Sequence, residues 1–186
     1  MKNIFKYASY ILCVTAIFIL LKPVFFYVKG FIIQNKLEYE WTQTIKNKKI
    51  NINDNLIYPI GRININEVDL SSIITGGDLK KSLEVSIGHI PYTSKPGELG
   101  NICLAGHRDT FFKKLEHVEI DDIIEIEHLK GTDEYKVQDI KIIQPDETNY
   151  LYESNEETLT LITCYPFEYL GNAPLRYIVI AKLFNI

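Results

Sequence analysis

From residue 56 onward the chain is a succession of short runs rich in isoleucine, valine, tyrosine and threonine. Glycine, proline, asparagine and aspartate separate these runs, and such residues favour turns. One short helix, residues 110–118, is expected among them. Many closely spaced strands with little helix indicate an all-β domain, either a closed barrel or a sandwich. The expected strands are residues 56–65, 82–89, 101–106, 123–127, 135–143, 158–164 and 175–184.

Two of these runs are expected at the centre of the sheet. Residues 159–162 and 177–181 are apolar at successive positions, as in strands buried on both faces, whereas residues 123–127 alternate isoleucine with glutamate. If residues 158–164 and 175–184 pair as antiparallel neighbours, the loop between them brings Cys164 close to Arg176.

Size and charge limit the kinds of partner. A chain of 186 residues has room for one soluble domain beside an N-terminal segment. Its formal net charge is -4, and it has no long basic block. Nucleic acid is therefore not expected as a partner, because nucleic-acid binding usually needs a clustered basic face.

The N-terminus has the pattern of an uncleaved signal anchor. Residues 7–21 carry no charge, Lys22 and Pro23 interrupt the run, and residues 24–28 continue it. Together they reach the ~20 residues that a membrane-spanning helix needs. Lys2 and Lys6 precede the run, and the residues after it lack the small side chains of a signal-peptidase site, which disfavours a removable signal peptide. We expect a signal anchor or transmembrane helix in residues 1–29, a polar linker in 30–55 and the β-rich domain in 56–186.

The chain has three cysteines, and they differ in context. Cys13 lies in the apolar N-terminal run, and Cys103 lies within the apolar segment 101–105. In an exported domain Cys103 and Cys164 could form a disulfide. We favour a free, buried Cys103, since a thiol within an apolar strand behaves as a small hydrophobic side chain.

Cys164, His107 and Arg176 each lie at the end of an expected strand and offer complementary chemistry. A thiolate is a nucleophile, and a nearby cation favours it over the thiol. Arg176 stays charged and is suited to donate to an oxyanion, whereas His107 can carry a proton. His117 and His128 stand beside acidic residues with no second histidine at metal-ligand spacing, so no metal site is predicted.

The sequence motifs around these residues strengthen the hypothesis that the three side chains act together. Thr160-Leu161-Ile162-Thr163-Cys164 is followed by Arg176 at the start of the next strand, and Gly106-His107-Arg108 follows an earlier one. This pattern resembles the sortase family, cysteine transpeptidases of the cell surface. The resemblance implies a sortase-type eight-stranded β-barrel with short helices, preceded by an N-terminal transmembrane helix.

The resemblance also implies a reaction. Cys164 would be the nucleophile, His107 the general acid and base, and Arg176 the support for the oxyanion and substrate. The enzyme would cleave an LPxTG-like sorting signal of a surface protein after its threonine through a thioacyl intermediate. It would then transfer that protein to an amine of a cell-wall precursor or another acceptor. Ala105, Ile162 and Thr163 match positions near the substrate groove of the family.

Localisation and cofactors follow from the same resemblance. The enzyme would be a single-pass protein of the cell membrane, with the N-terminus in the cytoplasm and the catalytic domain outside. No cofactor is required. Calcium modulation, as in some class A members, would need the acidic cluster after residue 145, which we interpret as a solvated loop: Asp146, Glu147, Glu153, Glu156 and Glu157.

Within the family, the sequence motifs of this chain are most similar to those of class D. The segments that carry this similarity are 106–112, 164–167 and 171–176. The lid motif typical of many class C enzymes is absent before residue 56. The stretch from 145 to 158 is too short for the extra helix of class B.

Other classes of protein fit less well. A non-catalytic, membrane-anchored β-domain that binds peptide or wall polymer is the main alternative, and it predicts an unreactive Cys164. An L,D-type transpeptidase would need a Ser-His-Gly-Cys context. A papain-like protease would have a tryptophan beside its cysteine, but Trp41 is far from Cys164 in the chain.

Overall fold

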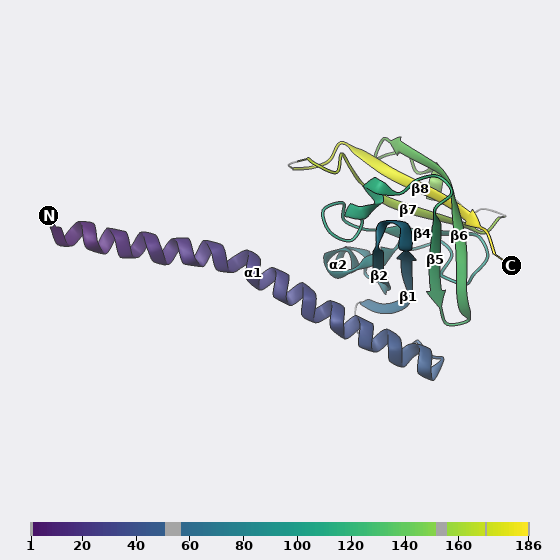
Figure 1. The fold of residues 1–186 in the computed structure, drawn as a ribbon, viewed down its shortest axis with the longest axis horizontal. Helices are drawn as coiled ribbons and strands as arrows, with labels where there is room; N and C mark the ends of the chain where they lie inside the picture. Colours follow the sequence, from purple (N-terminus) through teal and green to yellow (C-terminus); the bar gives the residue numbers. More distant parts are fainter. Residues whose placement is uncertain (1, 51–56, 152–155, 170, 186) are drawn as a thin grey trace. The chain divides into compact units, whose positions relative to one another are not determined.

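The structure, a computed structural model, describes residues 2–50, 57–151, 156–169 and 171–185, which divide into two compact units, 1–36 and 37–186. Figure 1 shows the elements in chain order. The helices are α1 (Lys2–Asn47) and α2 (Leu79–Val85), with 3₁₀ turns η1 (Asn66–Val68), η2 (Lys113–His117) and η3 (Asn149–Leu151). The strands are β1 (Ile57–Ile65), β2 (Leu70–Gly77), β3 (Ile87–His89), β4 (Asn101–Ala105), β5 (Ile123–His128), β6 (Gly131–Ile143), β7 (Thr158–Tyr165) and β8 (Leu175–Leu183).

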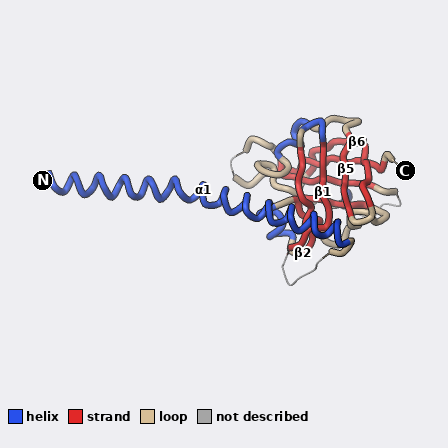
Figure 2. Tube along the Cα trace, turned by 60° about the horizontal axis from the view of Figure 1, so that its bottom comes forward, coloured by secondary structure: helices blue, strands red, loops and turns tan. Residues whose placement is uncertain are grey.

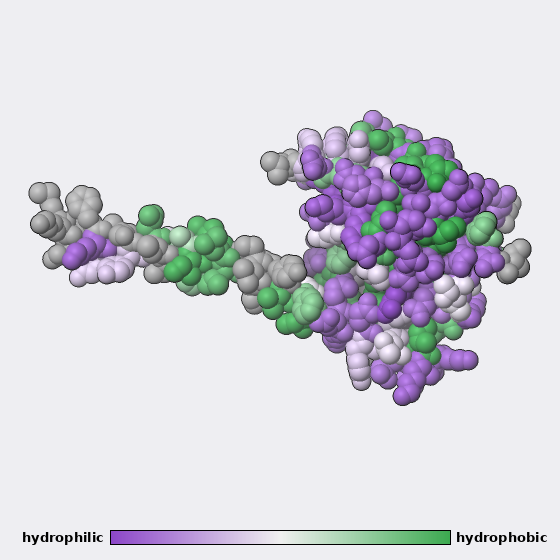
Figure 3. Space-filling model, viewed as in Figure 1, coloured by the Kyte–Doolittle hydropathy of each residue, from purple (hydrophilic) through white to green (hydrophobic). Residues whose placement is uncertain are grey.

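The first unit consists of the larger part of α1. Its apolar side chains are exposed along much of the helix, as the hydrophobic colouring in Figure 3 shows. In the portion of the chain that the structure describes, we find no helix with the combined length and apolarity to cross a bilayer.

The second unit is a closed β-barrel, which confirms the all-β prediction and decides between barrel and sandwich. Among the described residues the strand order is β1-β2-β3-β4-β7-β8-β6-β5, and β5 closes the barrel by pairing with β1. Figure 2 shows the strands of this barrel in red. The interior is filled by aliphatic residues from nearly every strand.

Two parts of the strand prediction are wrong. Residues 82–89 are not one strand, because α2 takes up the first half and only Ile87–His89 pairs in the sheet. The carboxylate of Asp78 caps α2 by accepting a hydrogen bond from the Lys81 amide at 3.2 Å. The prediction also missed β2, whose serines and glycines dilute the apolar signal. The expected helix 110–118 is the shorter η2.

The predicted linker, residues 30–55, differs from the observed structure. α1 continues through it to Asn47, and residues 51–56 lie outside the described part. Leu37, Trp41 and Thr44 are buried at helical spacing, so this end of the helix has a packed face. The linker prediction gave too little weight to Trp41, the largest apolar side chain of the segment.

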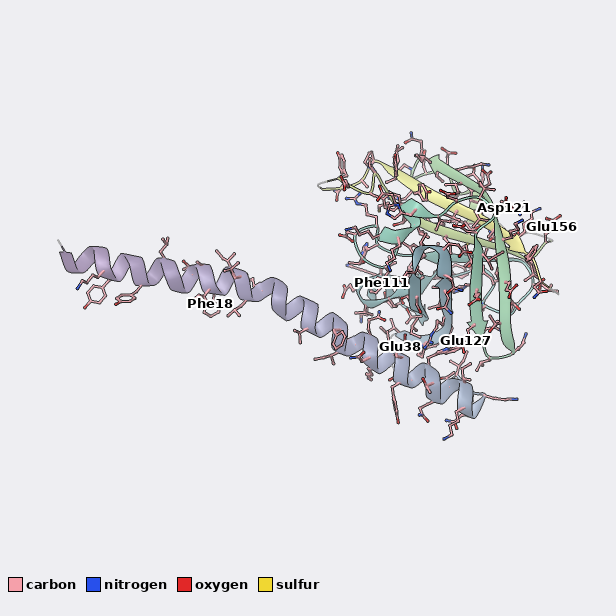
Figure 4. The ribbon with its side chains drawn as sticks, in the orientation of Figure 1. Phe18, Glu38, Phe111, Asp121, Glu127 and Glu156 are labelled. Carbon is pink, nitrogen blue, oxygen red and sulfur yellow. The ribbon has the colours of Figure 1, made fainter. Side chains whose placement is uncertain are left out.

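Polar contacts hold the same helix end on the barrel wall. The indole nitrogen of Trp41 donates to Glu127 of β5 at 2.9 Å. Arg62 of β1 is paired with Glu38 of α1 and lies 3.8 Å from Glu127. Glu38 and Glu127 are labelled at this junction in Figure 4. Residues 37–47 are therefore part of the folded barrel unit.

This packing makes a prediction for stability. Trp41→Ala is expected to lower the free energy of unfolding of the barrel by about 3–5 kcal/mol, because a fully buried aromatic side chain is removed. Urea denaturation of the full chain followed by circular dichroism measures this. Tyr39→Ala is the matched control: Tyr39 is 66% exposed on the same helix turn, and a change within about 0.5 kcal/mol is expected. Equal losses for the two variants would contradict the packing described here.

Candidate active site

Strand β7 carries Cys164 and runs between β8 and β4. It pairs with β8 in antiparallel fashion, and Cys164 is the direct ladder partner of Arg176. The predicted pairing of these two segments is therefore confirmed. Directly opposite residues project to the same face of a sheet, so the thiol and the guanidinium lie on one face.

On its other side β7 pairs with β4 in parallel, with Ala105 opposite Ile162. The ladder extends one step further, because the Gly106 amide donates to the Ile162 carbonyl at 3.2 Å. The Thr163 hydroxyl donates to the Gly106 carbonyl at 2.7 Å. His107 follows Gly106 directly, so it comes after β4 at the same end of the sheet at which Cys164 lies on β7.

The chain leaves the sheet directly after this point. A side chain at Gly106 would place its Cβ 2.8 Å from the ring of Phe112, which is fully buried, so only glycine fits without displacing that ring. The His107 carbonyl then accepts hydrogen bonds from the amides of Thr110 and Phe112, at 3.3 and 2.9 Å. This turn leaves the His107 side chain exposed at the sheet end.

The candidate residues lie on the outer face of the barrel wall. Leu159 and Leu161 of β7 belong to the interior core, so by alternation Ile162 and Cys164 project outward. Cys164 and Arg176 are both half-buried there. Arg176 donates to the carbonyls of Leu175 at 2.9 Å and Ala173 at 3.4 Å, which holds its guanidinium at the end of the β7–β8 connection.

The three predicted groove residues are placed differently. Ala105 and Ile162 are half-buried ladder partners, and Ile162 shares the outer face with Cys164. Thr163 projects to the opposite side, is 2% exposed, and its hydroxyl is bonded to the Gly106 carbonyl. In this structure Thr163 ties the ends of β4 and β7 together.

The second thiol of this sheet has a different environment. Cys103 is fully buried and, like Cys164, is free of any disulfide. Burial raises the pKa of the Cys103 thiol to about 12, so it stays protonated at neutral pH. The prediction of a free buried Cys103 is confirmed.

Arg108 is a functional candidate that the sequence analysis used only as part of a motif. Its Nη2 donates to the carbonyls of Tyr169 and Gly171 at 2.8 and 3.0 Å. Its guanidinium carbon lies 5.8 Å from the centre of the Tyr169 ring. The side chain therefore links the turn after β4 to the loop between β7 and β8. Its place directly after His107 was the available signal.

Aromatic packing fixes the start of that same loop. The rings of Tyr165 and Tyr177 stack at 6.1 Å, and Phe167 meets Tyr177 edge-on at 5.1 Å. Burial raises the pKa of Tyr177, so its hydroxyl is un-ionised at neutral pH. The residues just after Cys164 are thus held against the barrel.

Two of the other histidines and part of the acidic loop make structural contacts. His89 is buried, its Nε2 lies 2.9 Å from the Ser94 carbonyl, and burial lowers its pKa. His128 is buried 3.0 Å from Asp133. Glu147 accepts from the Gln144 amide, Glu156 pairs with Lys182, and Glu153 lies outside the described residues. No cluster with metal-binding composition occurs among the residues that the structure covers.

Comparison with known proteins now identifies the fold. The sortase domain family matches residues 63–184, which is well over half of the chain. The chain belongs to the sortase family. Among curated proteins, sortase D of Bacillus subtilis is 37% identical over 123 residues, covering 66% of this chain and 62% of the relative. The chain thus matches somewhat less than two thirds of that relative's length. The resemblance to class D is shown by this match.

Comparison with solved structures also finds sortases. A sortase D transpeptidase of Clostridium perfringens superimposes with a TM-score of 0.70 at 28% identity, covering 82% of this chain and 99% of the other. Sortase C1 of Streptococcus agalactiae superimposes with a TM-score of 0.63 at 30% identity, covering 69% and 68%. The eight-stranded sortase barrel predicted from the motifs is confirmed.

The two free thiols should react differently. At pH 8, iodoacetamide is expected to alkylate Cys164 in the folded chain but not Cys103, whose raised pKa keeps the thiol protonated and whose sulfur is buried. Peptide mapping by mass spectrometry, with and without urea, measures this. Labelling of Cys103 at the rate of Cys164 without urea would contradict the burial described here.

Proposed function

We propose that this sortase is a cysteine transpeptidase that cleaves an LPxTG-like sorting signal after its threonine and transfers the surface protein to an amine of the cell wall. The observation that carries the proposal is the register of β7. Cys164 faces Arg176 across the ladder with β8, and on its other side β7 pairs with β4 as far as Ala105 opposite Ile162, two residues before His107. A nucleophile, a fixed cation and a proton carrier meet at one end of the sheet.

In the first step Cys164, as the thiolate with its proton on His107, attacks the carbonyl carbon of the substrate threonine. Arg176 is fixed by carbonyls of the β7–β8 connection and donates to the oxygen that gains negative charge. As the peptide bond breaks, His107 gives a proton to the departing amine. The products are a thioester that joins the N-terminal part of the substrate to Cys164, and a released C-terminal fragment with a new free amine.

In the second step an amine of a wall precursor or another acceptor attacks the thioester carbonyl. His107 takes the proton that the amine loses, and the new amide bond releases the sulfur of Cys164. These side chains supply the nucleophile, the proton transfers and the charge stabilisation, so the proposed reaction needs no cofactor. The substrate lies along the outer face, where Ala105 and Ile162 flank the thiol.

We further propose that residues 1–29 anchor the enzyme to the cell membrane, with the N-terminus in the cytoplasm and the barrel outside. Residues 7–21 carry no charge, and apolar side chains such as Phe18 and Leu20 are exposed on α1. Protease added to intact cells should degrade the barrel of the anchored enzyme. A barrel that stays protected while an outer-surface marker is digested would contradict this orientation.

The reaction is tested by intact-mass spectrometry of the full chain with a panel of LPxTG-like peptides. The wild type should gain the mass of the acyl fragment and lose it when an amine is added. Cys164→Ala should gain nothing, whereas Cys103→Ala should behave as the wild type. No adduct with any peptide, together with a Cys164 inert to alkylating reagents, would favour the non-catalytic binding domain instead.

Arg176 provides a separate test. Arg176→Ala should lower kcat by about 10²–10³-fold, as for loss of one oxyanion donor, and Arg176→Lys should recover only part because it lacks the planar fork. Lys182→Ala removes the same charge from the far end of β8, where Lys182 pairs with Glu156, and should leave kcat nearly unchanged. Equal effects at the two positions would show a general charge effect in place of a local one.

A further inference from the structure

One side chain joins the two loops that carry the candidate catalytic residues. Arg108 follows His107 directly, and its side chain bonds the loop between β7 and β8. There its Nη2 donates two hydrogen bonds to main-chain oxygens, those of Tyr169 and Gly171. Bonds to carbonyls fix the path of the backbone itself, whatever side chains the loop carries.

The position of the guanidinium is specific. Its Cζ lies 5.8 Å from the centre of the Tyr169 ring, and its Nη2 donates to the Tyr169 and Gly171 carbonyls. Its Nη1 is buried without a hydrogen-bond partner among the described residues, which costs free energy. The charge-assisted bonds to the loop, with the ring contact, outweigh that cost. Arg108 is therefore held by the loop, and it holds the loop in return.

The loop is fixed at its two ends by other contacts. Next to Cys164, the rings of Tyr165, Phe167 and Tyr177 pack together. Next to Arg176, the guanidinium of that residue bonds the Ala173 and Leu175 carbonyls. Arg108 holds the stretch between these ends, and its own backbone is continuous with His107.

We propose that Arg108 is a positioning residue for the reaction. By bonding the Tyr169 and Gly171 carbonyls it sets the place of His107 relative to Cys164 and Arg176. The inference rests on the proposed function for its catalytic consequence, and it assigns Arg108 no contact with the reacting atoms. Loss of these bonds displaces the proton carrier from the thiol, and a misplacement on the order of 1 Å costs about a hundredfold in rate.

The test compares Arg108→Gln, Arg108→Lys and the control Lys114→Gln in the full chain. Lys114 lies in η2, a few residues along the same connection, but its ammonium pairs with Asp69 at 2.7 Å. We expect Arg108→Gln to lower kcat for an LPxTG-like peptide by about 10–100-fold with little change in KM. Its pH–rate profile should shift, because His107 is displaced. Arg108→Lys should recover part of the rate, and Lys114→Gln should resemble the wild type.

Two readouts do not require substrate turnover. Hydrogen exchange of the amides in residues 168–174, apart from proline, should speed up in Arg108→Gln and not in Lys114→Gln. The pH dependence of Cys164 alkylation should change in the same variant. If the wild type makes no acyl adduct, the proposed function fails, and these two readouts alone decide whether Arg108 couples the loops.

The proposal is overturned by either of two results. The first is unchanged exchange and alkylation in Arg108→Gln. The second, in an active enzyme, is a normal kcat and pH profile despite faster exchange, which would leave Arg108 a purely structural contact. A folded variant is verified by its urea denaturation midpoint, so that lost activity is not mistaken for unfolding.

Discussion

The site depends on the two neighbours of β7: β8 runs antiparallel to it on one side, and β4 runs parallel to it on the other. The antiparallel ladder with β8 returns the chain so that Arg176 faces Cys164, and the parallel ladder with β4 ends both strands at the same edge. His107 follows β4 at that edge. A barrel in which β4 ran antiparallel to β7 would put His107 at the far end of the sheet, with the same sequence motifs and no shared site.

Burial distinguishes the two cysteines that lie on these neighbouring strands. Cys103 is fully buried, and its sulfur lies 3.9 Å from the carbonyl oxygen of Tyr150. Burial raises the pKa of this thiol, so it stays protonated. Cys164 stands at the strand end, half-buried beside a fixed guanidinium. The same side chain therefore fills space at one position and is available for chemistry at the other.

The sequence predicted the strands that carry Cys164 and Arg176 better than the rest of the barrel. Dense apolar runs defined β7 and β8, and their antiparallel pairing was expected to bring Cys164 close to Arg176; the direct ladder partnership of the two residues came from the structure. β2 was missed because its burial comes from the closed sheet, which no local pattern shows. The packing of Trp41 on the wall of β1 and β5 is a contact between distant segments, and so is the bond from Arg108 to the Gly171 carbonyl. Such contacts depend on tertiary structure that the chain order does not reveal.

The alignment of His107 with Cys164 is tested most directly by disulfide trapping. In a chain carrying Cys13→Ser and Cys103→Ala, His107→Cys should form a disulfide with Cys164 under mild oxidation, since neighbouring strands hold Cα atoms within the range a disulfide spans. Asp109→Cys, exposed two residues further on, should not. A free Cys164 thiol in the oxidised His107→Cys protein, or equal trapping at both positions, would contradict the register on which this account of the active site rests.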